Sequence, residues 1–304
     1  MNVYLNKIKE SWIIDRIRKD WYENNKDIST NYIRQSNIFW IISPWVWKSI
    51  PKKALERKKV LCSHYHFDFN NFNEKDFYHL DSYVDEYHVI SLKTKKQLEQ
   101  LTDKKITSIP FWINQKDFYY KANKIELRKD LGFKPNQYLV GSFQRDTESH
   151  DLKSPKLIKG PDIFLDIVSK LNLEMNNLCV VLAGKNRNYL IDNFKKNNIK
   201  FKYFEMADFL TLNNLYNILD LYIVSSRIEG GPQAILEAAH IKTPIVSTDV
   251  GVAGEILSSE SIYKINHFSN SKPNIEFAFE KSKDYTIPNG MKKFRTLLDG
   301  LNES

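Results

Sequence analysis

The stretch Leu221–Glu255 reads LYIVSSRIEGGPQAILEAAHIKTPIVSTDVGVAGE and predicts a β-α-β unit. Its first residues, 221–225, are apolar and rich in strand formers, as in a buried strand. A glycine turn follows at residues 229–231. Pro232 stands where a helix would begin, because its missing N–H would have no partner at that position. An apolar helix then leads to a second strand that starts at Ile245.

Two carboxylates, Glu229 and Glu237, flank this glycine turn with seven residues between them. Backbone N–H groups at the start of a helix attract anions, and glycines let the oxygens of a ligand approach closely. A carboxylate beside such a turn can accept hydrogen bonds from sugar hydroxyls. The same pair also fits a plain Rossmann-like crossover with two solvated glutamates, so it is not specific alone.

The composition fits two globular domains. The chain has 304 residues, of which 42% are hydrophobic and 13% aromatic. Its 45 Lys and Arg against 37 Asp and Glu give a net charge of +8. This surplus fits a phosphate-bearing ligand, an anionic membrane surface or nucleic acid. Because no recognised nucleic-acid module accompanies it, we expect no nucleic-acid partner.

The cysteines and the apolar runs indicate the compartment. Cys62 and Cys179 each lie within a predicted strand, where buried free thiols are expected, as in a reducing cytosol. No apolar run reaches the length of a signal peptide or a membrane span. We therefore expect a cytoplasmic protein.

Residues 4–23 have the pattern of an amphipathic helix, with Ile8, Trp12 and Trp21 on the apolar side and lysines and arginines interleaved. Two interpretations are open. The helix packs on its own domain, or it lies at the membrane interface and gives the protein a peripheral contact with anionic lipid.

Strands alternate with helices along the whole chain, which predicts parallel sheets with helices on their faces. We expect a reduced sheet in the first half and a regular one in the second, joined by a Lys-rich linker at residues 114–137. The expected strands are 37–43, 60–63, 86–91, 106–111, 138–143, 179–183 and 202–204, followed by the two of the opening unit. The expected helices of the second half are 161–171, 187–196 and 212–219.

Glycines and charged residues of the second half fall just after strand ends. They are Gly141 with Arg145, Gly184 with Lys185, the turn 229–231, and Asp249 with Gly251. Ligands of open α/β sheets bind beyond the carboxyl ends of the strands. These positions therefore predict one binding edge.

Five segments follow one another in a recognisable order: VGSFQR (140–145), KGPDIF (159–164), LAG (182–184), SSRIEGGPQAILEAA (225–239) and PIVSTDVG (244–251). Together they resemble the signature of retaining glycosyltransferases of family four, the glycosyl transferases group 1 with the GT-B fold. The resemblance extends over residues 85–260 and is thin before them. It implies two Rossmann-like domains facing a cleft, with a reduced N-terminal domain.

The resemblance also implies roles for individual residues. Arg145 and Lys159 would neutralise the donor diphosphate, Glu229 would lie near the transferred sugar, and Glu237 would accept the ribose hydroxyls. We assign catalytic roles to Glu229, Arg145, Lys159 and His64. The residues expected to bind the donor are Gly141, Gly184, Lys185, Gly230, Gly231, Pro232, Gln233 and Glu237.

Two departures from the family pattern stand out. Arg145 and Lys159 are 14 positions apart, which is wider than the family spacing, so the segment between them resembles an insertion. Lys153 or Lys156 of that insertion could take the phosphate role in place of Lys159. The N-terminus also lacks a clear strand followed by a glycine-rich loop.

His64, His66 and Asp68 alternate, so an extended segment would place them on one face. Imidazole and carboxylate suit zinc or manganese, but no second cluster completes a metal site, and we expect none. The family places a histidine after this strand, near the reacting sugar. His64 matches that position best, and His66 is the alternative.

The sequence thus predicts a metal-independent retaining glycosyltransferase without a cofactor. Its donor would be a nucleotide-diphosphate sugar, and its acceptor a glycan, a lipid-linked sugar or a small molecule, as in polysaccharide biosynthesis. The expected domains are 1–130 on the acceptor side, 131–270 for the donor, and a tail, 271–304, that packs back on the first. The alternative is a non-catalytic GT-B-like subunit that binds a sugar nucleotide or glycan.

Overall fold

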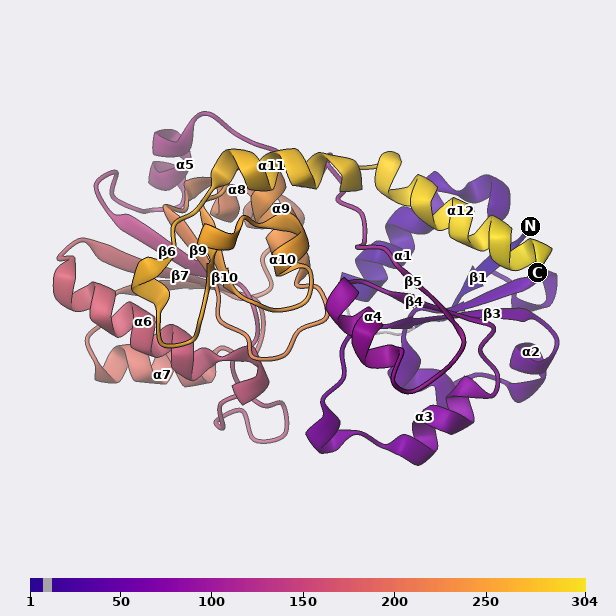
Figure 1. The fold of residues 1–304 in the computed structure, drawn as a ribbon. Helices are drawn as coiled ribbons and strands as arrows, with labels where there is room; N and C mark the ends of the chain where they lie inside the picture. Colours follow the sequence, from indigo (N-terminus) through magenta and orange to yellow (C-terminus); the bar gives the residue numbers. More distant parts are fainter. Residues whose placement is uncertain (8–12) are drawn as a thin grey trace. The chain divides into compact units, whose positions relative to one another are not determined.

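The computed structural model of the chain describes residues 1–7 and 13–304. They form two compact units, each with a fully parallel sheet (Figure 1). Unit 1 comprises Met1–Asn114 and Tyr285–Ser304, and unit 2 comprises Gln115–Asp284. The segment expected as a tail, 271–304, is thus divided between the two. The predicted α/β class with two Rossmann-like domains is confirmed.

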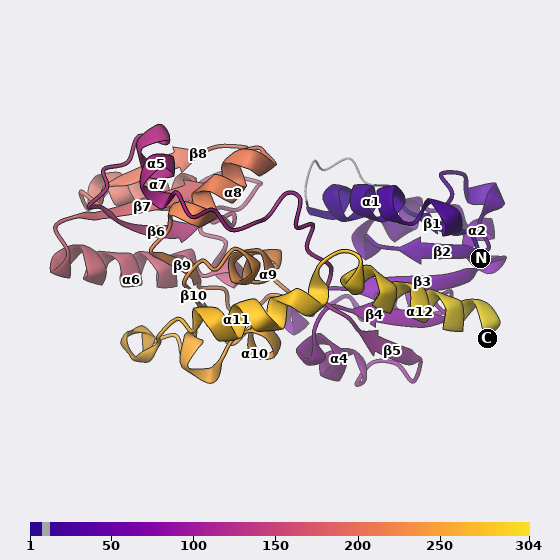
Figure 2. The same cartoon turned by 90° about the horizontal axis from the view of Figure 1, so that it is seen from above.

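Unit 1 contains a five-stranded sheet in the order β1-β2-β3-β4-β5. Alternate residues of its strands face opposite sides, as the two-residue period of a strand requires. Helices α1 (Ile13–Asn24) and α12 (Asn289–Glu303) cover one face, and three shorter helices cover the other. In Figure 2, α12 lies along β3. The strands are β1 (Val3–Leu5), β2 (Ile38–Ile41), β3 (Lys59–His64), β4 (Glu86–Val89) and β5 (Lys105–Ser108), and the shorter helices are α2 (Lys52–Glu56), α3 (Glu74–Asp81) and α4 (Leu92–Leu98).

The N-terminal helix differs from the prediction. Val3–Leu5 is a buried strand that pairs with β2, so the predicted helix does not include these residues, and α1 is described from Ile13 onward. Its apolar side chains, Ile14, Ile17 and Trp21, are buried in the core of unit 1, so they are not available to a membrane surface. Ile8 and Trp12, which the predicted helix included, lie outside the described residues. None of the helices in 1–7 and 13–304 is long and apolar enough to cross a membrane.

A buried hydrogen-bonded chain holds the middle of the unit 1 sheet. Trp40 Nε1 donates to Ser63 Oγ (2.8 Å), and Ser63 Oγ lies 2.8 Å from His88 Nδ1. His88 Nε2 lies 2.7 Å from the carbonyl oxygen of Ile109. Because a carbonyl can only accept, Nε2 carries the proton and Nδ1 accepts from the serine hydroxyl. Burial lowers the pKa of His88 to about 4, although the bond to Ile109 opposes it.

This buried imidazole should make the stability of the fold depend on pH. In the unfolded chain His88 titrates near its ordinary pKa of about 6.5. Between that pH and about 4, the unfolded chain binds a proton that the folded chain does not. The free energy of unfolding should therefore fall by up to about 3 kcal/mol as the pH drops through this window. Urea unfolding at pH 7 and pH 5 covers the upper part of this window, where the fall should be about 2 kcal/mol. His88→Gln should show a shallower fall, and equal slopes for both proteins would refute the assignment.

Unit 2 contains a six-stranded sheet in the order β11-β10-β9-β6-β7-β8. Helices α6 and α7 pack on one face, and α8 packs on the other through Tyr216 (Figure 1). Cys179 in β7 of this unit and Cys62 in β3 of unit 1 are free thiols, and both are buried, as predicted. The strands are β6 (Tyr138–Ser142), β7 (Leu178–Ala183), β8 (Phe201–Phe204), β9 (Leu221–Val224), β10 (Ile245–Thr248) and β11 (Ile262–Tyr263). The helices are α5 (Lys124–Asp130), α6 (Pro161–Glu174), α7 (Asn188–Lys196), α8 (Phe209–Ile218), α9 (Gln233–His240), α10 (Ala253–Ile256) and α11 (Ile275–Ser282).

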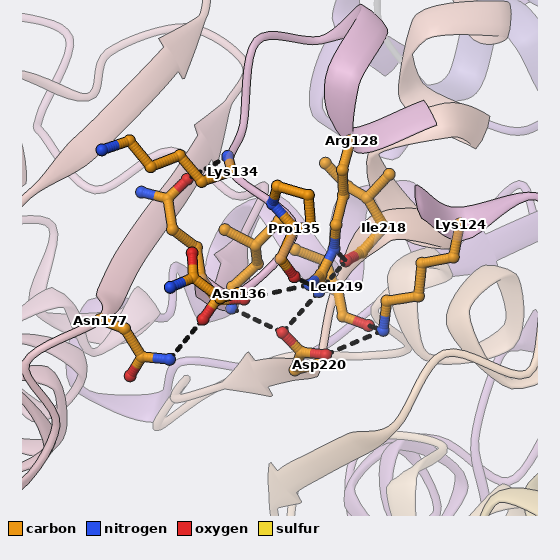
Figure 3. A network of polar contacts seen from close by, with 11 residues as sticks. Lys124, Arg128, Lys134, Pro135, Asn136, Asn177, Ile218, Leu219 and Asp220 are labelled. Carbon is orange, nitrogen blue, oxygen red and sulfur yellow. Dashed lines mark hydrogen bonds and ion pairs between the residues drawn. The ribbon is translucent and has the colours of Figure 1, made fainter. Parts of the chain in front are cut away.

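Residues 115–137 of the linker predicted at 114–137 belong to unit 2. Its helix α5 buries Arg128, whose guanidinium donates to Asp220 Oδ2 (2.5 Å) and to the carbonyl oxygen of Ile218 (Figure 3). Lys124 Nζ reaches the other oxygen of Asp220 at 2.9 Å. The same Asp220 carboxylate accepts from Leu139 N, at the start of β6. The Lys-rich segment is therefore tied to two strands of the sheet, which its composition does not reveal.

Candidate functional site

The carboxyl ends of β6, β7, β9 and β10 lie at one edge of the unit 2 sheet, because all four strands run parallel. The predicted site segments follow these ends directly. The edge brings together two ionisable residues that are 70 positions apart in the chain. Lys159 ends a short 3-10 turn, Leu157–Lys159, and Glu229 lies in the loop between β9 and α9.

Lys159 Nζ and Glu229 Oε1 form a close ion pair. The two side chains are 18% and 14% exposed, so each charge has lost most of its water. In an ion pair that is mostly removed from water, each charge depends on the other, because either charge alone would be poorly solvated. The two residues that sequence reasoning assigned to the diphosphate and to the transferred sugar are thus direct neighbours.

The main chain around Lys159 is fixed by hydrogen bonds to neighbouring strand ends. The carbonyl oxygen of Lys159 accepts from Gln144 Nε2 at 2.8 Å and from Ser225 Oγ at 3.4 Å. Gln144 Oε1 in turn accepts from Ser226 Oγ at 3.1 Å. Sequence reasoning missed Gln144, although it directly precedes Arg145. Its amide is what joins the end of β6 to the Lys159 turn.

Arg227 ties the same turn to the end of β9. Its backbone N–H and that of Ile228 both donate to the carbonyl oxygen of Ile158, at 2.8 and 3.1 Å. Its guanidinium donates to both carboxylate oxygens of Asp162, at 2.7 and 2.6 Å, and to the carbonyl oxygen of Leu157. Such a two-pronged contact is geometrically specific. The backbone positions of Lys159 and Glu229 are therefore set by the framework and not by their own ion pair.

Gly160 is required where the turn meets β9. Its φ is +61°, and a Cβ at this position would lie 1.8 Å from the carbonyl oxygen of Ser225. We expect Gly160→Ala to lower the free energy of unfolding by more than about 1 kcal/mol, because alanine suits neither the angle nor the space. Thermal and urea unfolding measure it. Gly300→Ala is the matched control, since Gly300 lies in α12 with no atom near its missing Cβ, and it should gain about 0.5–1 kcal/mol. Equal losses in both variants would contradict this requirement.

The glycine turn after β9 packs against the end of β10. Gly251 has a φ of +48°, and a Cβ there would lie 2.3 Å from the carbonyl oxygen of Gly230. Pro232 is the residue before α9, so the helix begins at Gln233, one residue later than predicted. This close backbone approach holds Gly230 and Gly231 in place beside Glu229.

Glu237 lies on the buried side of α9 and is 4% exposed. Its Oε2 accepts a hydrogen bond from Tyr216 OH at 3.0 Å. Tyr222 stands next to Tyr216, and its hydroxyl accepts from the backbone N–H of Phe143. Glu237 is thus built into a hydrogen-bonded cluster beneath the edge of the sheet. Its contact with a ribose stays a prediction.

The remaining predicted donor-binding residues lie along the ends of β6 and β7. Gly141 is inside β6, where a Cβ would lie 2.3 Å from Leu219 Cδ1, so the structure gives it a packing role. Arg145 is half-buried, Gly184 has a φ of +91°, and Lys185 is exposed. Their contacts with a donor stay predictions.

Within the predicted insertion, residues 146–158, the part 146–156 folds into a closed loop. The backbone N–H of Glu148 donates to the carbonyl oxygen of Ser154 at 2.9 Å. Lys156 Nζ forms an ion pair with Glu148 Oε2 at 2.9 Å, and Lys153 is exposed. Of the three lysines that the sequence left open, Lys159 is the one that meets Glu229.

Arg187 holds the start of this loop through Asp146. The sequence analysis did not identify it as a candidate. Its side chain is fully buried, and Nε donates to Asp146 Oδ2 at 2.7 Å. Nη1 donates to the carbonyl oxygens of Ser142 (2.8 Å) and Ala183 (3.1 Å), the last residues of β6 and β7. Burial raises the pKa of Asp146, against the opposing effect of Arg187. The pair joins two strand ends directly beneath the candidate site.

His64, His66 and Asp68 do not continue one extended strand, because β3 ends at His64 and Asp68 caps a short turn. His64 ends β3 and stacks on Phe67, with ring centroids 4.4 Å apart. Burial, with a smaller effect of His66, lowers the pKa of His64 to about 4. Asp68 caps the short turn that follows by accepting from Asn70 N. In the described part of the chain, no group of three potential metal ligands is present.

The sequence is similar to known proteins in its second half. Residues 153–267 match the family model of glycosyl transferases group 1. Over 162 residues the chain is 26% identical to the lipopolysaccharide core biosynthesis mannosyltransferase LpsB of Rhizobium meliloti. This similarity covers 51% of the chain and 44% of LpsB, so the chain matches less than half the length of that relative.

Solved structures resemble nearly the whole chain. HepE of Anabaena, crystallised with UDP and glucose, superimposes with a TM-score of 0.76 at 12% identity, covering 98% of this chain and 99% of HepE. Sucrose-phosphate synthase of Thermosynechococcus elongatus gives 0.70 at 13% identity, covering 97% and 80%. The lipopolysaccharide outer core galactosyltransferase WaaB gives 0.66 at 11% identity, covering 99% of each chain. The fold is therefore GT-B, as predicted.

Proposed function

We propose that this chain is a glycosyltransferase that moves a hexose from a nucleotide-diphosphate sugar to a hydroxyl group of a glycan, a lipid-linked sugar or a small acceptor. The observation that carries the proposal is the Lys159–Glu229 ion pair at the carboxyl edge of the unit 2 sheet. Both residues lie inside the segment that matches the glycosyl transferases group 1 model. The names of LpsB and WaaB, and the UDP and glucose bound to HepE, support the same class of reaction.

Each residue has a part in the proposed transfer. When the glycosidic bond breaks, negative charge grows on the leaving nucleoside diphosphate. Lys159 and Arg145 would neutralise that charge, and a fixed cation aimed at developing charge is among the strongest catalytic effects. This supports a transfer that needs neither metal nor cofactor. Glu229 would accept hydrogen bonds from hydroxyls of the transferred sugar, and Glu237 from the ribose.

We further propose that the transfer retains the configuration of the anomeric carbon. The nucleotide would depart from, and the acceptor hydroxyl would attack, the same face of the sugar. The proton of that hydroxyl would pass to an oxygen of the departing phosphate, so that few protein groups take part directly. Support for retention comes from the match to the motifs around Glu229 and Glu237.

A turnover assay with a panel of donors tests the proposed function. Release of nucleoside diphosphate from UDP-, GDP- and ADP-hexoses would be measured with and without added acceptor sugars. We expect one donor to be turned over, and the anomeric proton of the product, observed by NMR, to have the configuration of the donor. Binding of a sugar nucleotide without turnover would instead identify a non-catalytic subunit, and the absence of both binding and turnover would refute the proposal.

A further inference from the structure

The Lys159–Glu229 ion pair has a consequence for which ligands the site can hold. The ammonium of Lys159 and the carboxylate of Glu229 neutralise each other, and both side chains are mostly buried. A diphosphate that binds Lys159 competes directly with Glu229. When Lys159 turns to the phosphates, Glu229 becomes a poorly hydrated carboxylate beside a new negative charge, which is unfavourable unless hydrogen bonds replace the lost partner.

The backbone leaves little freedom to avoid this competition. The carbonyl oxygen of Lys159 is held by Gln144 and Ser225. Ile158, the residue before it, is held by two backbone N–H groups from the segment that leads into Glu229. The two residues therefore keep their relative backbone positions, and the ion pair opens only by rotation of the side chains.

An intact nucleotide sugar would replace both partners at once. Its diphosphate would take the place of Glu229 beside Lys159, and its sugar hydroxyls would donate hydrogen bonds to the released carboxylate. A free nucleoside diphosphate supplies only the first replacement. We infer that the Lys159–Glu229 pair makes the site select an intact nucleotide sugar over the free nucleoside diphosphate, and that it promotes release of that product after transfer. This inference rests on the proposed function.

Calorimetric titration of the full chain tests the selection, with UDP against UDP-glucose and GDP against GDP-mannose as probes. The quantity of interest is the ratio of the two dissociation constants within each pair. For Glu229→Gln, we expect the free diphosphate to bind about tenfold more tightly, a change of about 1.4 kcal/mol, because Lys159 no longer has a competing anion. The nucleotide sugar should gain less, so the ratio should approach one.

Glu148→Gln is the matched control. It makes the same substitution in a lysine–carboxylate pair of the same unit, with Glu148 and Lys156 joined at 2.9 Å and also partly buried. The ratio should stay at its wild-type value. An unchanged ratio in Glu229→Gln, or an equal change in Glu148→Gln, would overturn the inference. If wild type binds no member of either probe pair, the proposed function itself fails for these nucleotides, which is a distinct result.

Discussion

We expect Lys159→Met to lower kcat for sugar transfer by about 100- to 1,000-fold, the usual effect of removing one group that stabilises developing charge. Methionine keeps the length of the side chain and removes the ammonium. The fold loss in kcat should exceed the fold weakening of donor binding, because the negative charge on the departing diphosphate is larger in the transition state than in the bound donor. Initial rates over a range of donor concentrations separate kcat from KM.

Lys153→Met is the control for this variant. Lys153 lies on the insertion, precedes α6 in the chain as Lys159 does, and is exposed. It should keep wild-type activity within a factor of about two, as expected for a solvated surface charge. Unfolding temperatures of both variants should be recorded, because Lys159→Met also leaves Glu229 without its ion pair. Full activity in Lys159→Met, with a large loss in Lys153→Met, would move the phosphate contact to the insertion.

The second large effect concerns the stability of unit 2. Arg187→Met should lower the free energy of unfolding by about 3–5 kcal/mol, because Asp146 would remain as a buried carboxylate without its cation. Arg187 is 0% exposed and Asp146 is 2% exposed. The same substitution also removes the donors to the carbonyl oxygens of Ser142 and Ala183. Urea unfolding followed by far-ultraviolet circular dichroism measures the loss, because all six tryptophans lie within residues 1–114 and their fluorescence would report on unit 1.

Arg227→Met provides the matched comparison, because Arg227 and Asp162 form an Arg–Asp pair in which both side chains are 36% exposed. Solvent screens such a pair, and its loss should cost no more than about 1 kcal/mol. Replacing both buried partners, as Arg187→Met with Asp146→Leu, should recover part of the stability. Similar losses for Arg187→Met and Arg227→Met would show that burial does not govern the strength of these pairs.

The order of β6 to β10 and of the helices between them could be predicted from the sequence, because most of these strands are short apolar runs that end close to a glycine or a charged residue. The short strand β11 was not predicted, because it has only two residues. The strand Val3–Leu5 could not be predicted either, since it has three residues and overlaps an amphipathic pattern. Nor could the integration of residues 124–130, because the burial of Arg128 depends on Asp220, 92 positions later in the chain. A helix with a Lys-rich exposed surface, such as α5, has the same composition as a linker, so composition alone does not distinguish the two.

The site was predicted in its main residues but not in its connections. Lys159 and Glu229 were selected from motifs, and each was given a ligand contact. Their pairing with each other is a long-range contact that motif spacing does not encode. Gln144 and Arg187 were missed for a related reason: their importance lies in the carbonyl oxygens that they bind, and backbone acceptors leave no mark in a sequence.

Backbone hydrogen exchange with and without a saturating nucleotide sugar is the most direct test of where the donor binds. With the donor identified by turnover, we predict slower exchange in peptides that cover residues 157–160 and 229–233, because the framework around Lys159 and Glu229 would be closed by the ligand. Residues 31–35, which line a surface depression of unit 1, should not change. Protection confined to unit 1, with both unit 2 segments unaltered, would contradict the assignment of the site.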